Sequence, residues 1–184
     1  MNQDETQSPI SFPVNVARLP HKGMPVVIDA NEKQRAALAG LHELLSVESL
    51  HADVHVTSWK RNGVRVSGFV RARITQACIV TLDPIEARID EPVESVFLPE
   101  DSKLGRQGFN EGGEILLDAD GPDSPEVFSG DVIDVGALVE EFFGLAIDPY
   151  PRKPGISAEF SDGEVEEKEE TEFQKKLRDL SRKL

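Results

Sequence analysis

Cysteine is almost missing from this chain, because Cys78 is the only one among its 184 residues. One cysteine cannot form an intramolecular disulfide, and a cysteine-ligated structural zinc site needs two or more. Tyrosine and tryptophan also occur only once each. Hydrophobic residues make up 39% of the chain, which allows a core of modest size. Length and composition together predict one domain, or one domain with tails.

Long apolar runs are missing as well, since none approaches the roughly 20 residues of a membrane-spanning helix. The first residues, MNQDETQSPIS, are polar and acidic. They have neither the basic region nor the apolar region of a signal peptide. We therefore expect a soluble protein that works in the cytoplasm.

The motifs of catalysis and metal binding are also lacking. Neither G-x-S-x-G nor H-E-x-x-H occurs, and GRQGFNEGG has no Lys-Ser/Thr of a phosphate-binding loop. DADGPD, residues 118–123, resembles a calcium loop, but its glycine stands at the fourth position and no glutamate stands at the twelfth. We expect no enzyme, no cofactor and no metal.

Acidic residues are in excess, with 34 Asp and Glu against 20 Lys and Arg and a net charge of -14. Phosphates are repelled by such a surface, which argues against a general nucleic-acid coat. The charge is uneven, however. Residues 54–82 contain five Lys or Arg and no carboxylate, whereas residues 159–172 contain eight carboxylates and one lysine. The second run predicts a disordered, solvated linker.

The clearest pattern is the alternation from Val64 to Leu82, where even positions are mostly apolar and odd positions carry the arginines. A period of two predicts a half-buried strand, or one long bent strand. Gly68 lies within this strand and predicts a bulge. The dipeptide Asn62-Gly63 predicts a hairpin to a preceding strand.

The length of that hairpin loop decides which residues face the core. A two-residue Asn-Gly turn would place Val54 and Val56 on the outer face of the sheet. A three-residue loop over residues 61–63 brings both valines onto the inner, even face. We favour the three-residue loop, with Gly63 in the left-handed region.

Helices are indicated where a capping residue precedes an apolar stripe. Asn31 precedes leucines at helical spacing, and Asp134 precedes a second stripe; both residue types are good helix N-caps. The expected elements are a strand over 10–19, a helix over about 32–46, a strand over 85–98 and a helix over about 134–146.

Cys78 falls on the even, apolar face of its predicted strand, where a free cysteine behaves as a small hydrophobe. A nucleophilic thiol needs cationic or helix-terminal surroundings, and the arginines lie on the other face. His51 and His55 also face away from Cys78 if they lie in a strand. We interpret Cys78 as a packing residue.

The odd face of this strand carries Arg65, Arg71 and Arg73 around Phe69. Cationic groups around an aromatic ring are typical of RNA-binding surfaces, where arginine meets phosphate and the ring stacks on a base. The alternatives are an ordinary solvated face, or a face covered by the acidic linker. These four residues are candidate binding residues.

The segment DPYPRKPG, residues 148–155, cannot be helical because three prolines interrupt it. Its extended backbone pre-organises Tyr150 together with Arg152 and Lys153. One interpretation is a docking surface, where Tyr150 stacks on a base or fills a partner's pocket. The other is a helix end whose cations suit the negative end of the helix dipole.

Three segments in order resemble the YceD family, the bacterial large ribosomal RNA subunit accumulation proteins. They are ACIVTLDPI, GDVIDVGALVEEFFGLAIDPYPRKPG and EFQKKLRDLSRKL, and the resemblance extends from about Phe12 to the end. Members typically carry C-x-R-C-L where this chain has CIVTL, and some carry a further cysteine pair where this chain has DPYPRKPG. These replacements argue against carrying over a metal role. The resemblance implies a part in accumulation or processing of large-subunit ribosomal RNA in the bacterial cytoplasm, without known catalysis.

We therefore predict an α+β fold: an antiparallel curved sheet or partial barrel with two packed helices and a tethered C-terminal helix. The expected function is a non-catalytic ribosome biogenesis factor that contacts large-subunit ribosomal RNA or its proteins. The alternative is an acidic adaptor that binds a basic ribosomal protein without touching RNA. The predicted organisation is a disordered N-terminus over 1–9, the α+β domain over 10–156, an acidic linker over 157–171 and an amphipathic basic helix over 172–184.

Overall fold

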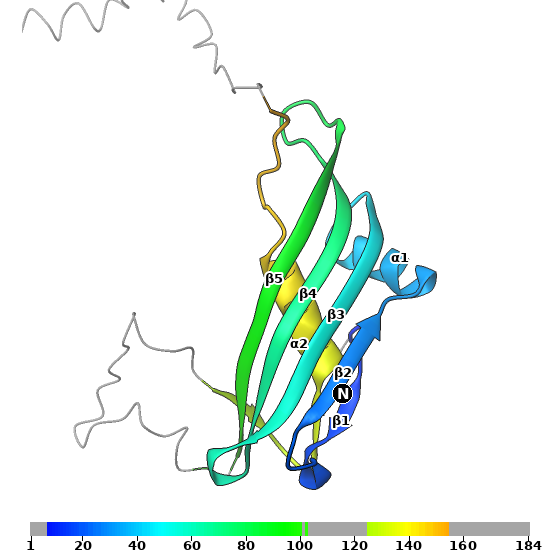
Figure 1. Cartoon of the computed structure of the whole chain (residues 1–184). Helices are drawn as coiled ribbons and strands as arrows, with labels where there is room; N and C mark the ends of the chain where they lie inside the picture. Colours follow the sequence, from blue (N-terminus) through cyan, green and yellow to red (C-terminus); the bar gives the residue numbers. More distant parts are fainter. Residues whose placement is uncertain (1–6, 101, 103–124, 155–184) are drawn as a thin grey trace, which may run out of the picture. The chain divides into compact units, whose positions relative to one another are not determined.

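Three long antiparallel strands form the frame of the fold, and β4 lies between the other two (Figure 1). They are β3, Ser46–Trp59; β4, Gly63–Ala77; and β5, Pro84–Pro99. This computed structural model describes residues 7–100, 102 and 125–154. Two shorter strands extend the sheet, β2 (Met24–Asp29) beside β3 and β6 (Glu126–Phe128) beside the end of β5. β6 runs parallel to β5, and every other pairing in the sheet is antiparallel.

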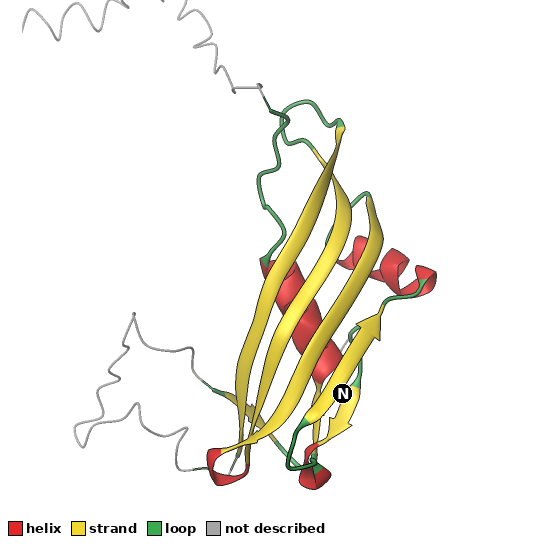
Figure 2. Cartoon of the chain, in the orientation of Figure 1, coloured by secondary structure: helices red, strands yellow, loops and turns green. Residues whose placement is uncertain are grey.

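A second sheet of two short strands joins the two ends of the domain. β1, Pro13–Asn15, pairs antiparallel with β7, Val132–Asp134. A single 3-10 turn, η1 (Val16–Arg18), follows β1, and its first N–H donates to the carbonyl of Asp131 at 2.8 Å. The second 3-10 turn, η2 (Lys60–Asn62), makes the connection between β3 and β4 (Figure 2).

Both helices begin at the residues that the sequence predicts. α1 spans Glu32–Leu41, and the Asn31 side chain accepts from the N–H of Gln34 while the Gln34 side chain accepts from the N–H of Asn31. α2 spans Val135–Leu145, and Asp134 accepts from its third residue, Ala137. These contacts satisfy backbone donors that the first helical turn leaves without partners.

The core lies between the sheet and the helices. α2 packs against β4 and β5, and α1 packs against β3. The apolar even residues of β3 and β4 point into this layer, as the alternation predicts. The fully covered members are Val54, Val56, Val66 and Val70 on the sheet and Val135, Val139 and Phe143 on α2.

The hairpin has the predicted parity but a different register. Trp59 pairs with Gly63, so the three-residue loop is 60–62 rather than 61–63. Asn62 adopts the left-handed conformation, with φ 62°, whereas Gly63 is extended. Gly63 is needed for space instead, because a Cβ there would lie 3.0 Å from the carbonyl of Phe97 on β5.

Gly68 does not mark a bulge, which corrects the sequence interpretation. It pairs regularly with Val54 and Val93, and the register shift of β3 lies between Val47 and Ser49. A Cβ on Gly68 would lie 2.2 Å from the carbonyl of Asp53. The glycine therefore permits a close approach of two backbones, which is the other common role of glycine in a strand.

The α+β class, the antiparallel sheet and the two packed helices are confirmed, and the sheet is open rather than closed. The first strand is wrong over most of 10–19, because only Pro13–Asn15 pairs. The first helix ends at Leu41 because the chain turns at Glu43, with φ 55°. The predicted linker and C-terminal helix lie outside the described residues. No helix in the described part of the chain has the length and hydropathy needed to cross a membrane.

Candidate functional site

The outer face of the sheet is the side that α2 does not cover (Figure 1). Arg65, Phe69, Arg71 and Arg73 all lie on this face of β4 and are exposed, as their parity predicts. They stand on the central strand of the frame, with β3 on one side and β5 on the other. A ligand on this face would therefore meet side chains of three strands.

Phe69 and Arg71 form the most distinctive pair of this face. The Arg71 guanidinium carbon lies 5.5 Å from the centre of the Phe69 ring. Phe69 is 47% exposed, although a phenylalanine of a folded domain is usually buried. An arginine beside an open aromatic ring can meet a phosphate while the ring stacks on a base.

Neighbouring strands neutralise part of this positive charge. Arg65 Nη2 lies 2.8 Å from Glu94 Oε1, and Arg71 Nε lies 3.1 Å from Asp90 Oδ1. Both carboxylates belong to β5. The carboxylate-free run 54–82 does not make a purely basic face, because cross-strand partners supply the carboxylates that the run lacks.

Arg73 differs from the other two arginines. Its Nε donates to the Ser49 hydroxyl at 3.4 Å, and its cross-strand neighbour on β5 is Arg88. Burial tends to raise the pKa of Glu48, but hydrogen bonds from Ser46 and Thr75 lower it, and the positive charge of Arg73 adds a smaller lowering. Arg73 and Arg88 thus place two positive charges opposite each other on neighbouring strands.

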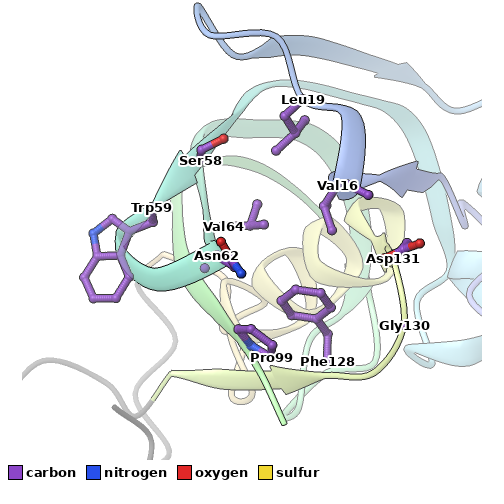
Figure 3. Close-up of a pocket in the computed structure, with 12 residues that line it drawn as sticks. Val16, Leu19, Ser58, Trp59, Asn62, Val64, Pro99, Phe128, Gly130 and Asp131 are labelled. Carbon is purple, nitrogen blue, oxygen red and sulfur yellow. The ribbon is translucent and has the colours of Figure 1, made fainter. Parts of the chain in front are cut away.

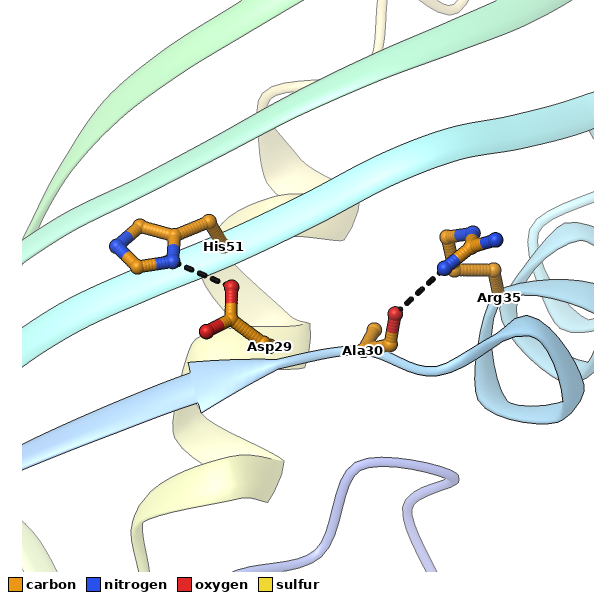
Figure 4. Close-up of polar contacts among 4 residues, drawn as sticks. All are labelled: Asp29, Ala30, Arg35 and His51. Carbon is orange, nitrogen blue, oxygen red and sulfur yellow. Dashed lines mark hydrogen bonds and ion pairs between the residues drawn. The ribbon is translucent and has the colours of Figure 1, made fainter.

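Histidines continue the polar rows toward β2. His51 Nδ1 lies 2.6 Å from Asp29 Oδ1, the last residue of β2. Just past the end of β2, the Ala30 carbonyl accepts from Arg35 of α1 at 2.7 Å (Figure 4). His55 Nε2 hydrogen-bonds the carbonyl of Lys22 at 2.9 Å. The two histidine contacts hold β2 beside β3, the strand that separates it from the arginine-bearing β4.

Cys78 is fully buried, with 0% of its surface exposed, as predicted. Its surroundings are polar rather than apolar, however, because β4 ends at Ala77 and Cys78 begins a turn. Hydrogen bonds from the side chain and N–H of Thr81 and from the N–H groups of Lys153 and Val80 lower the pKa of the thiol to about 6, against the opposing effect of burial. The sulfur is thus a hydrogen-bond acceptor that holds a turn together.

The donor set around Cys78 does not fit a metal ion. Thiolate zinc sites take several cysteine or histidine ligands, and here Thr81 and backbone N–H groups surround a single sulfur. Across the described ranges, no three His, Cys, Asp or Glu residues gather into a possible metal site.

The β4–β5 turn, residues 78–83, is joined to the proline segment, residues 148–153. The N–H of Ile79 donates to the carbonyl of Pro151 at 3.0 Å, and Lys153 Nζ lies 2.8 Å from Asp83 Oδ2. Near the end of β4, the buried Gln76 side chain donates to the carbonyl of Asp148 at 2.9 Å. The segment is non-helical, as predicted.

The three predicted residues of the proline segment have different surroundings. Tyr150 and Arg152 are exposed, whereas Lys153 is half-buried and engaged by Asp83. No described hydrogen bond or ion pair links them to the arginines of the outer face, so the structure gives two candidate surfaces instead of one. Sequence reasoning missed the turn's part in the second surface, because the contact between residues 79 and 151 is long-range.

A cavity of about 510 Å³ opens at the other end of the sheet (Figure 3). Val16, Val64 and Phe128 supply apolar walls, and Ser58, Asn62 and Asp131 supply polar groups. η1, the β3–β4 loop and β6 converge there. Sequence reasoning missed this cavity, because its walls come from elements that are distant in the sequence.

Comparison with known proteins gives one match. The family model described as "Large ribosomal RNA subunit accumulation protein YceD" matches residues 66–181, more than half of the chain. Neither the curated proteins nor the solved structures contain a match. The matched range includes β4 from Val66 onward, β5, the β4–β5 turn, α2 and the proline segment. It excludes η1, the β3–β4 loop and the start of β4 with Arg65.

Proposed function

This chain belongs to the YceD family, and from that premise we propose that it supports the accumulation of large-subunit ribosomal RNA as a non-catalytic assembly factor in the bacterial cytoplasm. The proposed mode of action is direct contact between the RNA and the outer face of the sheet. The named family supplies the class of RNA, and the residues of β4 supply the chemistry of contact.

The exposed Phe69 ring beside Arg71 is the observation that carries this proposal. Proteins recognise RNA mostly at unpaired bases, which stack on aromatic rings and arginine planes. Phe69 lies on the central strand, on a face that neither described helix covers, so its ring is accessible to such a base. Arg73 and its neighbour Arg88 extend the contact along the strands toward the phosphates.

The paired carboxylates limit how strongly this face attracts RNA. Arg65 and Arg71 have to exchange Glu94 and Asp90 for phosphate, whereas Arg73 has no ion pair to break in the described chain. The proposed complex is therefore selective for unpaired, stackable bases and of modest affinity. Binding weakens with salt, because each arginine–phosphate contact releases counterions from the RNA.

Titration of a labelled single-stranded large-subunit RNA fragment at several salt concentrations tests the proposal. Arg73→Gln is expected to reduce the slope of log affinity against log salt by about 0.7, the value for one phosphate contact on single strands. Phe69→Ala should weaken binding by roughly 1–3 kcal/mol, the usual loss of one stacked base, and keep the slope. Arg18→Gln, an exposed arginine of η1, is the control and should change neither quantity.

The adaptor without RNA contact is the second candidate. The outer face also carries Asp29, Asp53 and Glu86, and the chain has a net charge of -14, which suits a basic ribosomal protein. This alternative replaces the first if the wild-type protein binds no large-subunit RNA at low salt but retains a basic large-subunit protein after ribonuclease treatment.

A further inference from the structure

Exposed apolar side chains gather on the two segments that meet beyond the end of β4. Leu82 is 77% exposed and Tyr150 is 70% exposed. Ile79 and Val80 are exposed as well. We refer to these four residues as the turn patch. Contiguous exposed apolar residues often mark sites of protein contact.

The turn patch is held rigidly. Within the β4–β5 turn, the N–H of Cys78 donates to the carbonyl of Asp83 and the N–H of Leu82 donates to the carbonyl of Cys78, at 2.8 and 2.9 Å. The Ile79–Pro151 hydrogen bond and the Lys153–Asp83 ion pair then fasten the proline segment to it. Rigid apolar groups lose little conformational freedom when a partner covers them, which favours binding.

Leu82 occupies a backbone conformation that leucine avoids. Its φ is 61°, in the left-handed region where glycine and asparagine are at ease and a bulky side chain is strained. The strained conformation does not bury the Leu82 side chain inside the domain, because most of the side chain is in solvent. A glycine would close the same turn without strain, so turn closure does not explain the leucine side chain.

The chemistry of the patch selects the class of partner. Ile79, Val80 and Leu82 are aliphatic, and aliphatic side chains neither stack on bases nor pair with phosphates. Their burial requires an apolar surface of a protein. Arg152 is exposed beside the patch, and the described chain gives it no ion pair, which suits a carboxylate on that surface. A net charge of -14 also disfavours an anionic membrane as the partner.

The family match covers residues 66–181, and both segments of the turn patch lie within it. We propose that the turn patch docks into an apolar pocket, bordered by a carboxylate, on a large-subunit ribosomal protein, with Leu82 and Tyr150 as the inserted side chains and Arg152 at the rim. This proposal rests on the proposed role in ribosomal RNA accumulation, but uses a surface separate from Phe69 and Arg71.

Site-specific photo-crosslinking tests the docking of the turn patch. The full chain with a benzoyl-phenylalanine at position 150 is mixed with large-subunit proteins stripped of RNA, and separately with protein-free large-subunit RNA. We expect one identified ribosomal protein to be crosslinked. The Leu82→Gly change should lower the affinity for that protein by roughly tenfold, as for a buried apolar anchor. The same change should raise Tm by about 2–4 °C, because it removes backbone strain.

A second turn offers a matched control. Asn62 of η2 also has a positive φ of 62°, so Asn62→Gly introduces a glycine into a similar backbone conformation without touching the turn patch. This variant should keep full affinity for the crosslinked protein. Arg152→Gln should weaken the complex, and Arg152→Lys should restore part of the loss because the positive charge is kept.

The outcomes separate the two proposals. Unchanged affinity of the Leu82→Gly variant overturns the docking proposal, as does crosslinking to RNA alone, to a second copy of the chain alone, or to nothing. Phe69→Ala should leave the protein crosslink intact while weakening RNA binding. If RNA binding is absent but the protein crosslink depends on Leu82, the RNA-contact proposal fails and the docking proposal stands.

Discussion

Arg65 on β4 and Glu94 on β5 form an ion pair across the outer face, with 2.8 Å between Nη2 and Oε1. Asp90 of β5 forms a similar ion pair with Arg71, so two of the three arginines that the sequence identified are paired with carboxylates of β5. Exposed pairs of this kind contribute only about 0.2–1 kcal/mol to stability. Their larger effect is on how much positive charge the face offers to a ligand.

We expect the double variant Glu94→Gln with Asp90→Asn to bind single-stranded large-subunit RNA more tightly than wild type. Both arginines are then free for phosphate, so the salt dependence should become steeper by up to about 0.7 for each arginine that gains a phosphate. Fluorescence anisotropy at several salt concentrations measures both quantities. Glu86→Gln is the control, because Glu86 faces Thr75 rather than an arginine. Equal slopes in all three proteins would exclude RNA contact by Arg65 and Arg71.

Cys78 should make stability depend on pH. The folded pKa of about 6 lies below the ordinary value of 9.0, so the thiolate form is favoured by folding. This contribution is fully present above the unfolded pKa and is lost as the pH falls through about 6. Cys78→Ala should therefore cost more stability at pH 9 than at pH 5.5, as measured by urea unfolding.

A titration of the thiolate by its ultraviolet absorbance checks the cause. Thr81→Val removes the hydroxyl that hydrogen-bonds the sulfur and should raise the thiol pKa in the native protein. An ordinary pKa in the wild type, together with a pH-independent effect of Cys78→Ala, would contradict this account and restore the simple packing role.

Of the two helix caps, Asp134 should be the one whose removal lowers the free energy of unfolding more. Burial tends to raise its pKa, but hydrogen bonds from Ser11, Phe12, Ala137 and Gly136 hold the pKa below the usual value. The carboxylate accepts from the Phe12 N–H at 2.8 Å and from the Ser11 hydroxyl at 2.5 Å while it caps α2. Asp134→Ala is expected to cost about 2–3 kcal/mol of unfolding free energy at neutral pH, for a lost cap and further lost hydrogen bonds.

The sign of the pH effect is fixed by the lowered pKa. The stabilising contribution of Asp134 is present above the unfolded pKa and disappears as the pH falls through the folded pKa. The difference between wild type and Asp134→Ala in unfolding free energy should therefore shrink in acid. Asn31→Ala, which removes the cap of α1, is the comparison and should cost about 1 kcal/mol. A constant difference across the acid range would show that the carboxylate charge is unimportant.

Two glycines of the helices should respond oppositely to alanine. A Cβ on Gly136, in the first turn of α2, would lie 1.9 Å from the carbonyl oxygen of Ile10, so the backbone has to move. Gly136→Ala should destabilise by about 1–3 kcal/mol or more, as overpacking does. Gly40 of α1 has open space around its Cβ position, so Gly40→Ala should stabilise by about 0.5–1 kcal/mol. Thermal unfolding of both variants measures the contrast.

The alternation of apolar residues and the helix N-cap residues predicted most of the fold. β4, β5 and both helix starts follow from residues within one element, and the inner position of Val54 and Val56 follows from the parity of the loop. The register was wrong because Asn62 takes the left-handed position, and the sequence Asn-Gly does not say which of its residues will do so. The short strands were predicted poorly for another reason, since β1 was predicted too long and β6 was missed. Both exist only through pairing with distant residues.

β2 shows that a local signal can also be overlooked. Val26 and Ile28 are buried and Val27 is exposed, which is the alternation of a strand in MPVVID. Pro25 argues against a central strand but is compatible with the edge position that β2 takes. The run is short and contains Pro25, which weakens its strand signal.

The sequence predicted where the candidate side chains lie, but not which of their charges are paired. The parity of β4 placed Arg65, Arg71 and Arg73 correctly, but their carboxylate partners depend on which strand lies alongside. The exposed, left-handed position of Leu82 could not be predicted from the sequence. Its left-handed backbone results from a turn that is closed by Cys78 and Asp83 and braced by the proline segment.

The pairing of β1 with β7 has a consequence for how the chain is made. The β3–β4–β5 meander pairs neighbours in sequence, whereas Val14 has to find Ile133 near the far end of the domain. During synthesis, the N-terminal segment waits for that partner until almost the whole domain has left the ribosome. Ile10 and Val14, both fully covered at the end, stay exposed to solvent and to chaperones until that last closure.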